Sequence, residues 1–516
     1  MVGLGNGRQG ISRRCCLRVL GRSVIGVSAA GLLAACGAGA PATSGGTSGS
    51  ASVTVAGSAS VAAATSQAAT SSAKTAVATS ATAAVATTAA AKGGPTPSPV
   101  PPPKSSGKGS VVFESPGIGL AESKPFQQIV DDFSKKTGIK VAYVDGGLNF
   151  EKFAVQFAGG SGGDLYEYET KQVPHYAVDG VFENLDPYIA KSTIVKPAEY
   201  FPITWSKGKV QGHQYTVPWD TTPVVVYYNK DIFKQAGITP PSAKWGDDTW
   251  DWNAFLSTAQ KLTKSDKTIF GCDISTWWVY SLPWIWSNGG QVVNQELTKV
   301  QYTQQAVQDA WQFLVDLRWK YNVWSQPSQK HADFNTGGVA MFLSGPYSIP
   351  GLRAAAKVPW DVVPVPKGKA GIWTRDPSDS LTIWNGSKNK DEAFQLMEYI
   401  TGPEGQLVIG KSGRGVPSRH SVATSKAFLE QGDGVNWQVF ADGPNHEGEQ
   451  PVTDVWPQMD SMTGKVLDAM WNNKANVSET TTKLEQTIQP LLDQAKERRD
   501  LSAWYLPVGW KSPVYS

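Results

Sequence analysis

Residues 110–144, SVVFESPGIGLAESKPFQQIVDDFSKKTGIKVAYV, decide the fold class of this chain. Val111-Val112-Phe113 is typical of a short strand, and residues 139–144 are typical of a second one. Between them, residues 125–137 predict a helix that Gly138 ends, because apolar side chains recur at helical spacing at Phe126, Ile129, Val130 and Phe133. Strand, helix and strand in this order form the unit of a parallel sheet, so the sequence predicts an α/β protein.

The same alternation continues toward the carboxyl end. Residues 224–228, VVVYY, form a continuous apolar run of the kind found in strands that are buried on both faces. Amphipathic patterns predict helices at residues 251–262, 304–320, 390–401 and 477–496.

Aromatic residues mark where the folded part begins. The 20 Trp, 16 Tyr and 17 Phe of the 516-residue chain all lie from Phe113 onward. The preceding hundred or so residues lack the bulky apolar side chains that would repay the entropy lost on folding. About 400 residues are left to fold, which exceeds the ~250–300 that one core usually organises, so two lobes are expected.

Charge argues against a nucleic-acid-binding protein, and cysteine content argues against a disulfide-stabilised fold. Nine of the 47 basic residues lie in the leader and the linker, which leaves 38 bases against 44 acidic residues and a net charge of about −6 for the body. A body of that charge makes nucleic acid an unfavourable partner. Of the four cysteines, only Cys272 lies in the aromatic-bearing region, so no disulfide framework is expected there.

The amino terminus, residues 1–36, resembles a lipoprotein signal peptide. A basic segment with Arg13-Arg14 precedes an apolar stretch, residues 19–35, that ends in Leu33-Ala34-Ala35-Cys36. The two arginines also resemble a twin-arginine export signal, and the Sec route stays open. An uncleaved anchor helix is the alternative, but the apolar run is shorter than the ~20 residues that a bilayer needs. Lipidation at Cys36 would hold the body on the outer face of the cytoplasmic membrane.

Residues 37–108 predict a disordered tether. They consist mainly of Ala, Ser, Thr and Gly and end in a run rich in proline, residues 95–103. A flexible chain of that length spans on the order of 45–50 Å, which lets the body reach beyond the membrane surface.

Several motifs of the body occur together in one known family. Residues 212–218, GHQYTVP, precede the apolar strand, and residues 229–237, NKDIFKQAG, follow it. Further matching segments are residues 176–189, 249–263, 287–290 with 313–317, 334–341 with 345–347, and 388–406 with 413–419. In this order they resemble extracellular solute-binding proteins of family 1, the maltose-binding-protein-like receptors of ABC importers. The resemblance covers nearly all of the body.

The resemblance implies a fold and a role. It implies a type II periplasmic-binding-protein-like architecture of two α/β lobes joined by a multi-strand hinge, with crossings near residues 218–223, Pro364 and Ser412. The expected lobes are residues 109–222 with 364–412, and residues 223–363 with 413–516. A protein of this family captures a small solute and passes it to the transmembrane subunits of an ABC permease. We expect it to act as a monomer, without cofactor or metal.

Aromatic residues point to a carbohydrate ligand, because sugar rings stack on aromatic faces while carboxylates bind their hydroxyls. Trp277, Trp278 and Tyr280 crowd one loop. The resemblance places this loop, Tyr347 and Tyr168 in the cleft. The polar candidates and one neighbouring tryptophan are Glu114, Glu169, Trp219, Asp220 and Arg414. For each polar candidate, a solvated charge or a salt bridge between lobes is the competing interpretation. Core packing is the competing interpretation for each ring. We expect Trp311 and Trp319 to be core residues, and Asp164 to be structural.

Enzyme functions lack support in the sequence. The five histidines are scattered without metal-ligand spacing, and neither a nucleophile elbow nor a P-loop is present. The prediction is a lipid-anchored receptor for a sugar or oligosaccharide. The alternatives are a receptor of the same fold for a peptide, polyamine or glycerol-phosphate compound, and a secreted carbohydrate-active enzyme. Cys272 is expected to be a small apolar residue.

Overall fold

The computed structural model describes residues 109–116, 120–146, 150–329, 332–448 and 450–496. The predicted signal peptide with Cys36 and the predicted tether lie outside the described residues. Within the described ranges, no helix is both long enough and apolar enough to cross a membrane.

The opening strand, helix and strand are confirmed. β1 (Ser110–Ser115) pairs in parallel with β2 (Lys140–Asp145), and α1 (Leu120–Thr137) connects them. The helix begins five residues before the predicted start and contains Pro125. It ends where predicted, because Gly138 adopts a φ of 78° that favours glycine. The four apolar side chains that predicted the helix are all buried, so this face packs on the sheet.

Five strands form the first sheet, in the order β2-β1-β3-β11-β6. β3 (Leu165–Glu169) is parallel to β1, whereas β11 (Asp379–Ile383) is antiparallel to both β3 and β6 (Val217–Pro218). The sheet is therefore mixed rather than purely parallel. Because β11 follows β6 by more than 150 residues, distant parts of the chain complete this sheet.

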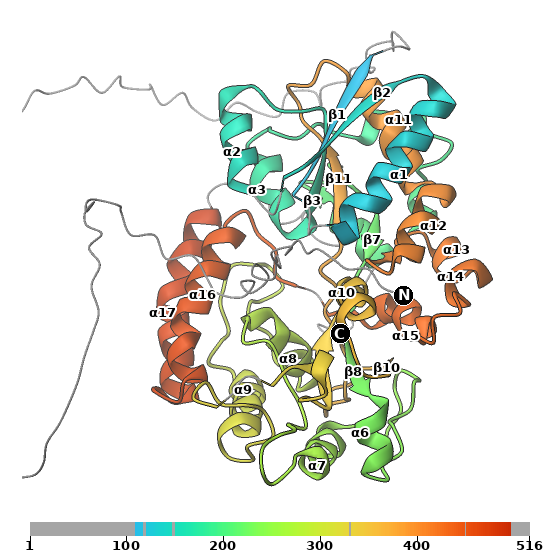
Figure 1. Ribbon diagram of the computed structural model, residues 1–516. Helices are drawn as coiled ribbons and strands as arrows, with labels where there is room; N and C mark the ends of the chain where they lie inside the picture. Colours follow the sequence, from blue (N-terminus) through green and yellow to red (C-terminus); the bar gives the residue numbers. More distant parts are fainter. Residues whose placement is uncertain (1–108, 117–119, 147–149, 330–331, 449, 497–516) are drawn as a thin grey trace, which may run out of the picture. The chain divides into compact units, whose positions relative to one another are not determined.

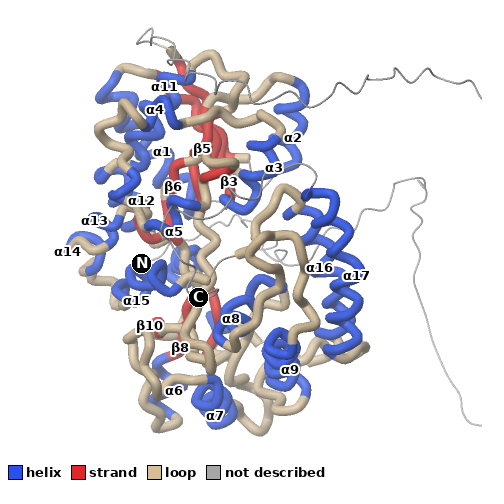
Figure 2. The backbone as a smooth tube through the Cα atoms, turned by 180° about the vertical axis from the view of Figure 1, so that it is seen from behind, coloured by secondary structure: helices blue, strands red, loops and turns tan. Residues whose placement is uncertain are grey.

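Helices cover both faces of the first sheet (Figures 1 and 2). On one side lie α1, α11 (Lys390–Thr401) and α12 (Pro403–Ser412), and on the other α2 (Phe150–Gly159) and α3 (Val173–Val178). The other elements of this part of the chain are η1 (Thr170–Gln172), α4 (Asp186–Ile189), η2 (Pro197–Glu199), α5 (Pro202–Ser206), β4 (Lys209–Val210) and β5 (His213–Gln214).

Three antiparallel strands form a second sheet. β8 (Val225–Asn229) lies between β10 (Trp360–Val363) and β9 (Met341–Ser344). All five residues of β8 are buried, which confirms the strand that the apolar run predicted. Asn229 also begins the next helix, because its side chain accepts hydrogen bonds from the Asp231 and Ile232 backbone amides.

The second sheet has its own helices, and the amphipathic predictions made for α7, α9 and α17 are confirmed to within one residue. The helices are α6 (Lys230–Gln235), α7 (Trp252–Leu262), η3 (Trp278–Ser281), α8 (Leu282–Ser287), α9 (Gln305–Trp319), η4 (Phe334–Thr336), η5 (Pro346–Ser348) and α10 (Ile349–Ala355). α16 (Trp456–Trp471) and α17 (Val477–Lys496) run side by side near α9 (Figures 1 and 2).

The chain passes between the two sheets at several points. One passage lies between β6 and β8, and another between β10 and β11. In the first passage β7 (Asp220–Thr221) pairs with β12 (Val416–Pro417), so two segments lie together there. The elements after β12 are α13 (His420–Ala423), α14 (Lys426–Leu429), α15 (Trp437–Asp442) and η6 (Gly443–His446).

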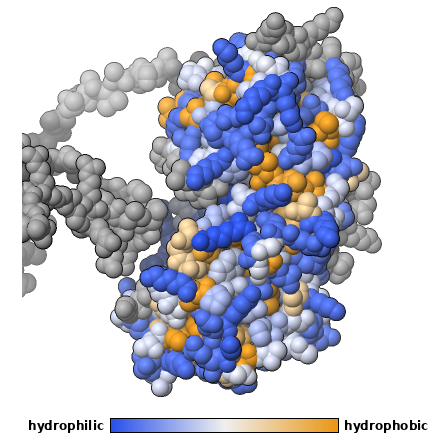
Figure 3. Space-filling model, turned by 45° about the vertical axis from the view of Figure 1, so that its right-hand side comes forward, coloured by the Kyte–Doolittle hydropathy of each residue, from blue (hydrophilic) through white to orange (hydrophobic). Residues whose placement is uncertain are grey.

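Tryptophan supplies much of the core. Trp311 is fully buried and stacks on Tyr302 with ring centroids 5.9 Å apart, which confirms it as a core residue. Trp319 is only half-buried and packs at the margin of the same cluster. Cys272 is a buried free thiol in this cluster, as expected of a small apolar residue. Figure 3 shows one face of the molecule, on which hydrophilic side chains predominate and hydrophobic ones form small patches.

Candidate functional site

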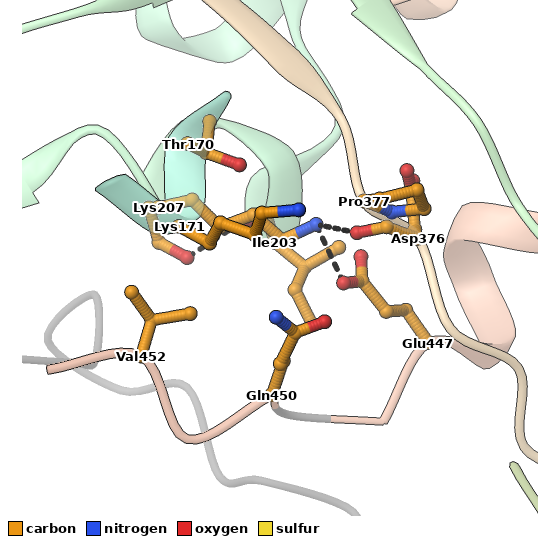
Figure 4. Close-up of a pocket in the computed structure, with 10 residues that line it drawn as sticks. Thr170, Lys171, Ile203, Lys207, Asp376, Pro377, Glu447, Gln450 and Val452 are labelled. Carbon is orange, nitrogen blue, oxygen red and sulfur yellow. Dashed lines mark hydrogen bonds and ion pairs between the residues drawn. The ribbon is translucent and has the colours of Figure 1, made fainter. Parts of the chain in front are cut away.

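A small cavity lies beyond the carboxyl end of β3. Its volume is about 30 Å³, which holds one or two water molecules. Segments from four parts of the chain line it (Figure 4), with the side chains of Thr170, Lys171, Ile203, Ser206, Lys207, Asp376, Pro377, Glu447, Gln450 and Val452. Ligands of open α/β sheets bind beyond the carboxyl ends of strands, and this cavity occupies such a position.

Lys207 joins segments that line the cavity through an ion pair and two hydrogen bonds. Its ammonium lies 2.5 Å from Glu447 Oε1 and donates to the Asp376 backbone oxygen at 2.7 Å and to Ser378 Oγ at 3.1 Å. Burial raises the pKa of Glu447 to about 8, although the charge of Lys207 opposes this shift. Near neutral pH the Glu447 carboxyl is therefore partly protonated.

Glu169, a predicted ligand residue, contacts Lys171, which lines the cavity. Its carboxylate accepts hydrogen bonds from Lys171 Nζ at 3.0 Å and from Gln172 Nε2 at 3.1 Å. Burial opposes ionisation of this carboxyl, but Lys171 and Gln172 outweigh it and lower the pKa of Glu169. Glu169 is thus an ionised, partly exposed acceptor beside the cavity.

Three predicted aromatic residues lie close to these charges. Trp277 is 36 % exposed, and its ring centroid lies 4.6 Å from Lys171 Nζ and 4.9 Å from Arg375 Cζ. The hydroxyls of Tyr280 and Tyr347 lie 2.5 Å apart, and Arg375 Cζ is 5.8 Å from the Tyr280 ring. Burial and the neighbouring Tyr347 raise the pKa of Tyr280 well above its ordinary value, so the Tyr280 hydroxyl is neutral.

Trp278 differs from its neighbour Trp277. Its indole nitrogen donates to Asp460 Oδ1, as that of Trp277 does, but its ring is fully buried and lies 5.4 Å from the Trp456 ring. Emptying this position would leave a cavity in the core. In this structure Trp278 packs as a core residue that supports the loop.

Tyr168 and Trp219 are also enclosed. Tyr168 is fully buried beside the rings of Phe153, Tyr176 and Phe182. Trp219 is 1 % exposed, and its ring contacts that of Phe126 at 4.9 Å. Neither ring presents a face to the cavity.

Glu114 lies within the first sheet rather than at the cavity. It is buried and accepts hydrogen bonds from Lys152 at 2.9 Å, Gln156 at 3.1 Å and Tyr166 at 3.2 Å. Asp164 is structural, as expected, because its carboxylate accepts from the Val112 amide at 2.8 Å and from Ser387 Oγ at 2.6 Å.

Asp220 and Arg414 form a buried ion cluster where the chain passes between the sheets. Arg414 Nη1 lies 3.2 Å from Asp220 Oδ2, and its Nη2 lies 2.8 Å from Asp379 Oδ2. Burial and the charge of Asp379 raise the pKa of Asp220 well above its usual range, while Arg414 opposes the shift. In this structure Asp220 and Arg414 form a salt bridge with each other, which was the competing interpretation of both residues in the sequence.

The sequence did not single out Arg375, Lys171, Lys207, Glu447 or Gln450. These residues come together only through tertiary contacts, such as the hydrogen bond from Arg375 Nε to Gln450 Oε1 at 3.1 Å. A charged pair, Arg375-Asp376, between the second sheet and β11 was the signal available in the sequence. In the described part of the chain, no group of three His, Cys, Asp or Glu side chains is placed to hold a metal ion.

Solved structures share this fold. An ABC substrate-binding protein of Listeria monocytogenes, in complex with cycloalternan, matches with a TM-score of 0.66 and 21 % identity over 75 % of this chain and 99 % of that one. UgpB of Mycobacterium tuberculosis, in complex with glycerophosphocholine, matches with a TM-score of 0.66 and 19 % identity over 75 % and 99 % of the two chains. The predicted fold class is therefore confirmed: two α/β lobes of the type II periplasmic-binding-protein kind, joined by a multi-strand hinge.

Residues 117–407 match the model of the family described as bacterial extracellular solute-binding protein, and the chain belongs to that family. A binding protein of Brucella abortus (strain 2308) is 22 % identical over 388 residues, which cover 69 % of this chain and 90 % of that protein. Members of the family are receptors for solutes rather than enzymes.

Proposed function

We propose that this protein captures a sugar or oligosaccharide in the cleft at the cavity and delivers it to an ABC permease. The observation that carries the proposal is the site itself. Arg375 lies over the Trp277 and Tyr280 rings, Tyr347 contacts Tyr280, and the ionised Glu169 contacts Lys171 beside Trp277, which combines rings for stacking with charged hydrogen-bonding groups. The cycloalternan complex of the Listeria protein and the name of a related maltotriose-binding protein from Pyrococcus abyssi support a carbohydrate ligand.

Capture requires the walls of the cavity to separate. A volume of about 30 Å³ does not admit a sugar ring. The proposed moving parts are the lobes expected from the sequence, residues 109–222 with 364–412 and residues 223–363 with 413–516. The strand membership of the two sheets supports this division. A ligand that contacts both lobes only when they are shut shifts the equilibrium toward the closed form.

Delivery completes the proposed role. Lipidation of Cys36 would anchor the protein at the outer face of the cytoplasmic membrane, and residues 37–108 would let the monomeric body reach the permease. The transporter supplies the energy. Cys36→Ser should release the protein from the membrane fraction without changing its affinity for ligand, and mass spectrometry of the mature amino terminus checks the modification. A mature chain that begins elsewhere would refute lipidation.

Thermal unfolding with a panel of sugars tests the binding role. A ligand that binds only the folded state raises the midpoint, by an amount that grows with its concentration. Small-angle scattering of the body should then show a smaller radius of gyration with the ligand than without it. An unchanged radius at saturation contradicts closure, and turnover of a sugar would instead indicate an enzyme.

A further inference from the structure

Arg375 differs from the other buried arginines. Arg375, Arg414 and Arg419 are only 1 %, 3 % and 6 % exposed. Arg414 pairs with two aspartates, and Arg419 Nη2 lies 3.1 Å from Glu199. Among the residues that the structure describes, Arg375 forms no ion pair with a carboxylate. Glu169 and Glu447 are near enough for the charge of Arg375 to act on their pKa, but neither contacts it directly, so this buried guanidinium calls for an explanation.

The contacts of Arg375 leave part of its guanidinium unused. Nε donates to Gln450 Oε1 at 3.1 Å, and the guanidinium lies over the Trp277 and Tyr280 rings. Nη2 is buried and has no hydrogen-bond partner within the described ranges. Aromatic rings favour a cation above them but do not accept a strong hydrogen bond, so a donor stays available.

Arg375 is joined to the lining of the cavity through two of its neighbours. Gln450, which Arg375 contacts, and Asp376, which follows it in the chain, both line the cavity (Figure 4). Lys171 and Lys207 add two more cations to the lining.

Three acids offset these cations in part: Glu169 pairs with Lys171, and Asp376 and Glu447 lie in the lining. Asp376 keeps its negative charge, and its carboxylate is held in place by hydrogen bonds from the Thr221 hydroxyl, the Thr222 amide and the Ser378 amide. Glu447, with its raised pKa, carries less than a full negative charge near neutral pH. Three cations, Arg375, Lys171 and Lys207, therefore face two full negative charges and the partial charge of Glu447, which leaves a small positive excess.

We infer that the captured solute carries an oxyanion, a carboxylate or a phosphate, which accepts a hydrogen bond from Arg375 Nη2 while its ring lies against Trp277 and Tyr280. A guanidinium binds such oxyanions with charge-assisted hydrogen bonds. Gln450 positions the guanidinium through Nε. This inference rests on the proposed function, since it assumes that the cleft binds a solute, and it narrows the ligand to acidic sugars or phosphorylated polyols.

Matched ligand pairs test the inference on the wild-type protein. Titration calorimetry should compare glucose with glucuronate, glucose with glucose 6-phosphate, and glycerol with glycerol 3-phosphate. The anionic member of at least one pair should bind about 30-fold tighter or more, since a hydrogen bond to a charged group has that magnitude. The glucuronate arm indicates a carboxylate, and the phosphate arms indicate a phosphate. Binding of neutral sugars or maltodextrins alone overturns this inference and leaves the proposed function intact. Absence of binding across the whole panel overturns both.

Arg375→Gln tests the residue. It should weaken binding of the anionic solute about 30-fold or more and change binding of its neutral counterpart less than about threefold. Arg318→Gln is the matched control, because the Arg318 guanidinium lies 3.9 Å from the centroid of the Trp324 ring, and neither residue is among those that line the cavity. It should leave affinity unchanged.

The unfolding midpoint of the ligand-free variant separates binding from structure. Removal of an unpaired buried charge should leave the midpoint of Arg375→Gln unchanged or raised. A large fall in the midpoint together with normal affinity in the folded fraction would show that Arg375 is structural, and would overturn the inference. If the variant does not fold, the wild-type ligand pairs decide the question.

Discussion

Arg414 and Arg375 are both nearly fully buried, yet their surroundings differ. Arg414 bridges Asp220 and Asp379, so its charge is balanced within the chain. Arg375 has one amide partner and two aromatic rings, and its Nη2 has no hydrogen-bond partner among the described residues. The difference separates a charge that joins segments of the fold from one that is prepared for an incoming group.

Removal of Arg414 should have the largest effect on stability. Arg414→Gln leaves two neighbouring buried aspartates without their cation, which should lower the free energy of unfolding by about 3–5 kcal/mol. Urea unfolding measures this change, and Arg375→Gln, measured beside it, should lose less than about 1 kcal/mol. Equal losses of unfolding free energy in the two variants would show that both arginines have the same structural role.

The same comparison extends to the tryptophans. Trp311→Ala empties a fully buried site and should cost about 3–5 kcal/mol of unfolding free energy. Trp277→Ala removes a ring that is 36 % exposed and should cost about 1 kcal/mol, while weakening ligand binding. Chemical denaturation followed by calorimetry on the folded variants checks both. If Trp277→Ala unfolds as readily as Trp311→Ala and binds normally, its ring belongs to the core.

Tyr347 should affect binding more than stability. Tyr347→Ala removes a half-buried ring beside the Tyr280 hydroxyl and should weaken ligand binding by about 2 kcal/mol. Tyr347→Phe keeps the ring and removes only the hydroxyl, so it should retain most of the affinity. Calorimetric titration distinguishes the two, and a loss confined to stability would place Tyr347 outside the binding site.

Glu447 should give an effect of another kind, a dependence of stability on pH. Its folded pKa of about 8 exceeds the ordinary value of 4.5, so the folded state binds more protons between these values. Stability from this group is fully present below about pH 4.5 and is lost as pH rises through 8. The contribution is at most about 1.4 kcal/mol per pH unit.

Urea unfolding at pH 6 and pH 8 measures this dependence as the difference between wild type and Glu447→Gln. The variant should lose less stability over this range than the wild type. Glu430→Gln, at an exposed pair with Lys426, is a control that should follow the wild type. Parallel behaviour of wild type and Glu447→Gln would contradict the shifted pKa.

Much of the fold followed from the sequence because its signals are local. The apolar spacing in α1, the continuous run in β8 and the amphipathic patterns of α11 and α17 each lie within one element. The motif order also identified the family, which the match over residues 117–407 confirmed. These patterns depend on residue spacing along a helix or strand, and neighbouring residues suffice to predict them.

The tertiary structure decided which charges are paired. From the sequence, Arg414, which lies between two glycines, was a ligand candidate, and Arg375, which precedes Asp376, was not distinguished. Arg414 meets Asp220 across 194 positions, and Arg375 meets Gln450 across 75. The tertiary structure also decided that Trp278 is buried while its neighbour Trp277 is partly exposed. Burial and ion pairing are set by contacts between distant segments, and residue type and spacing along the chain do not specify them.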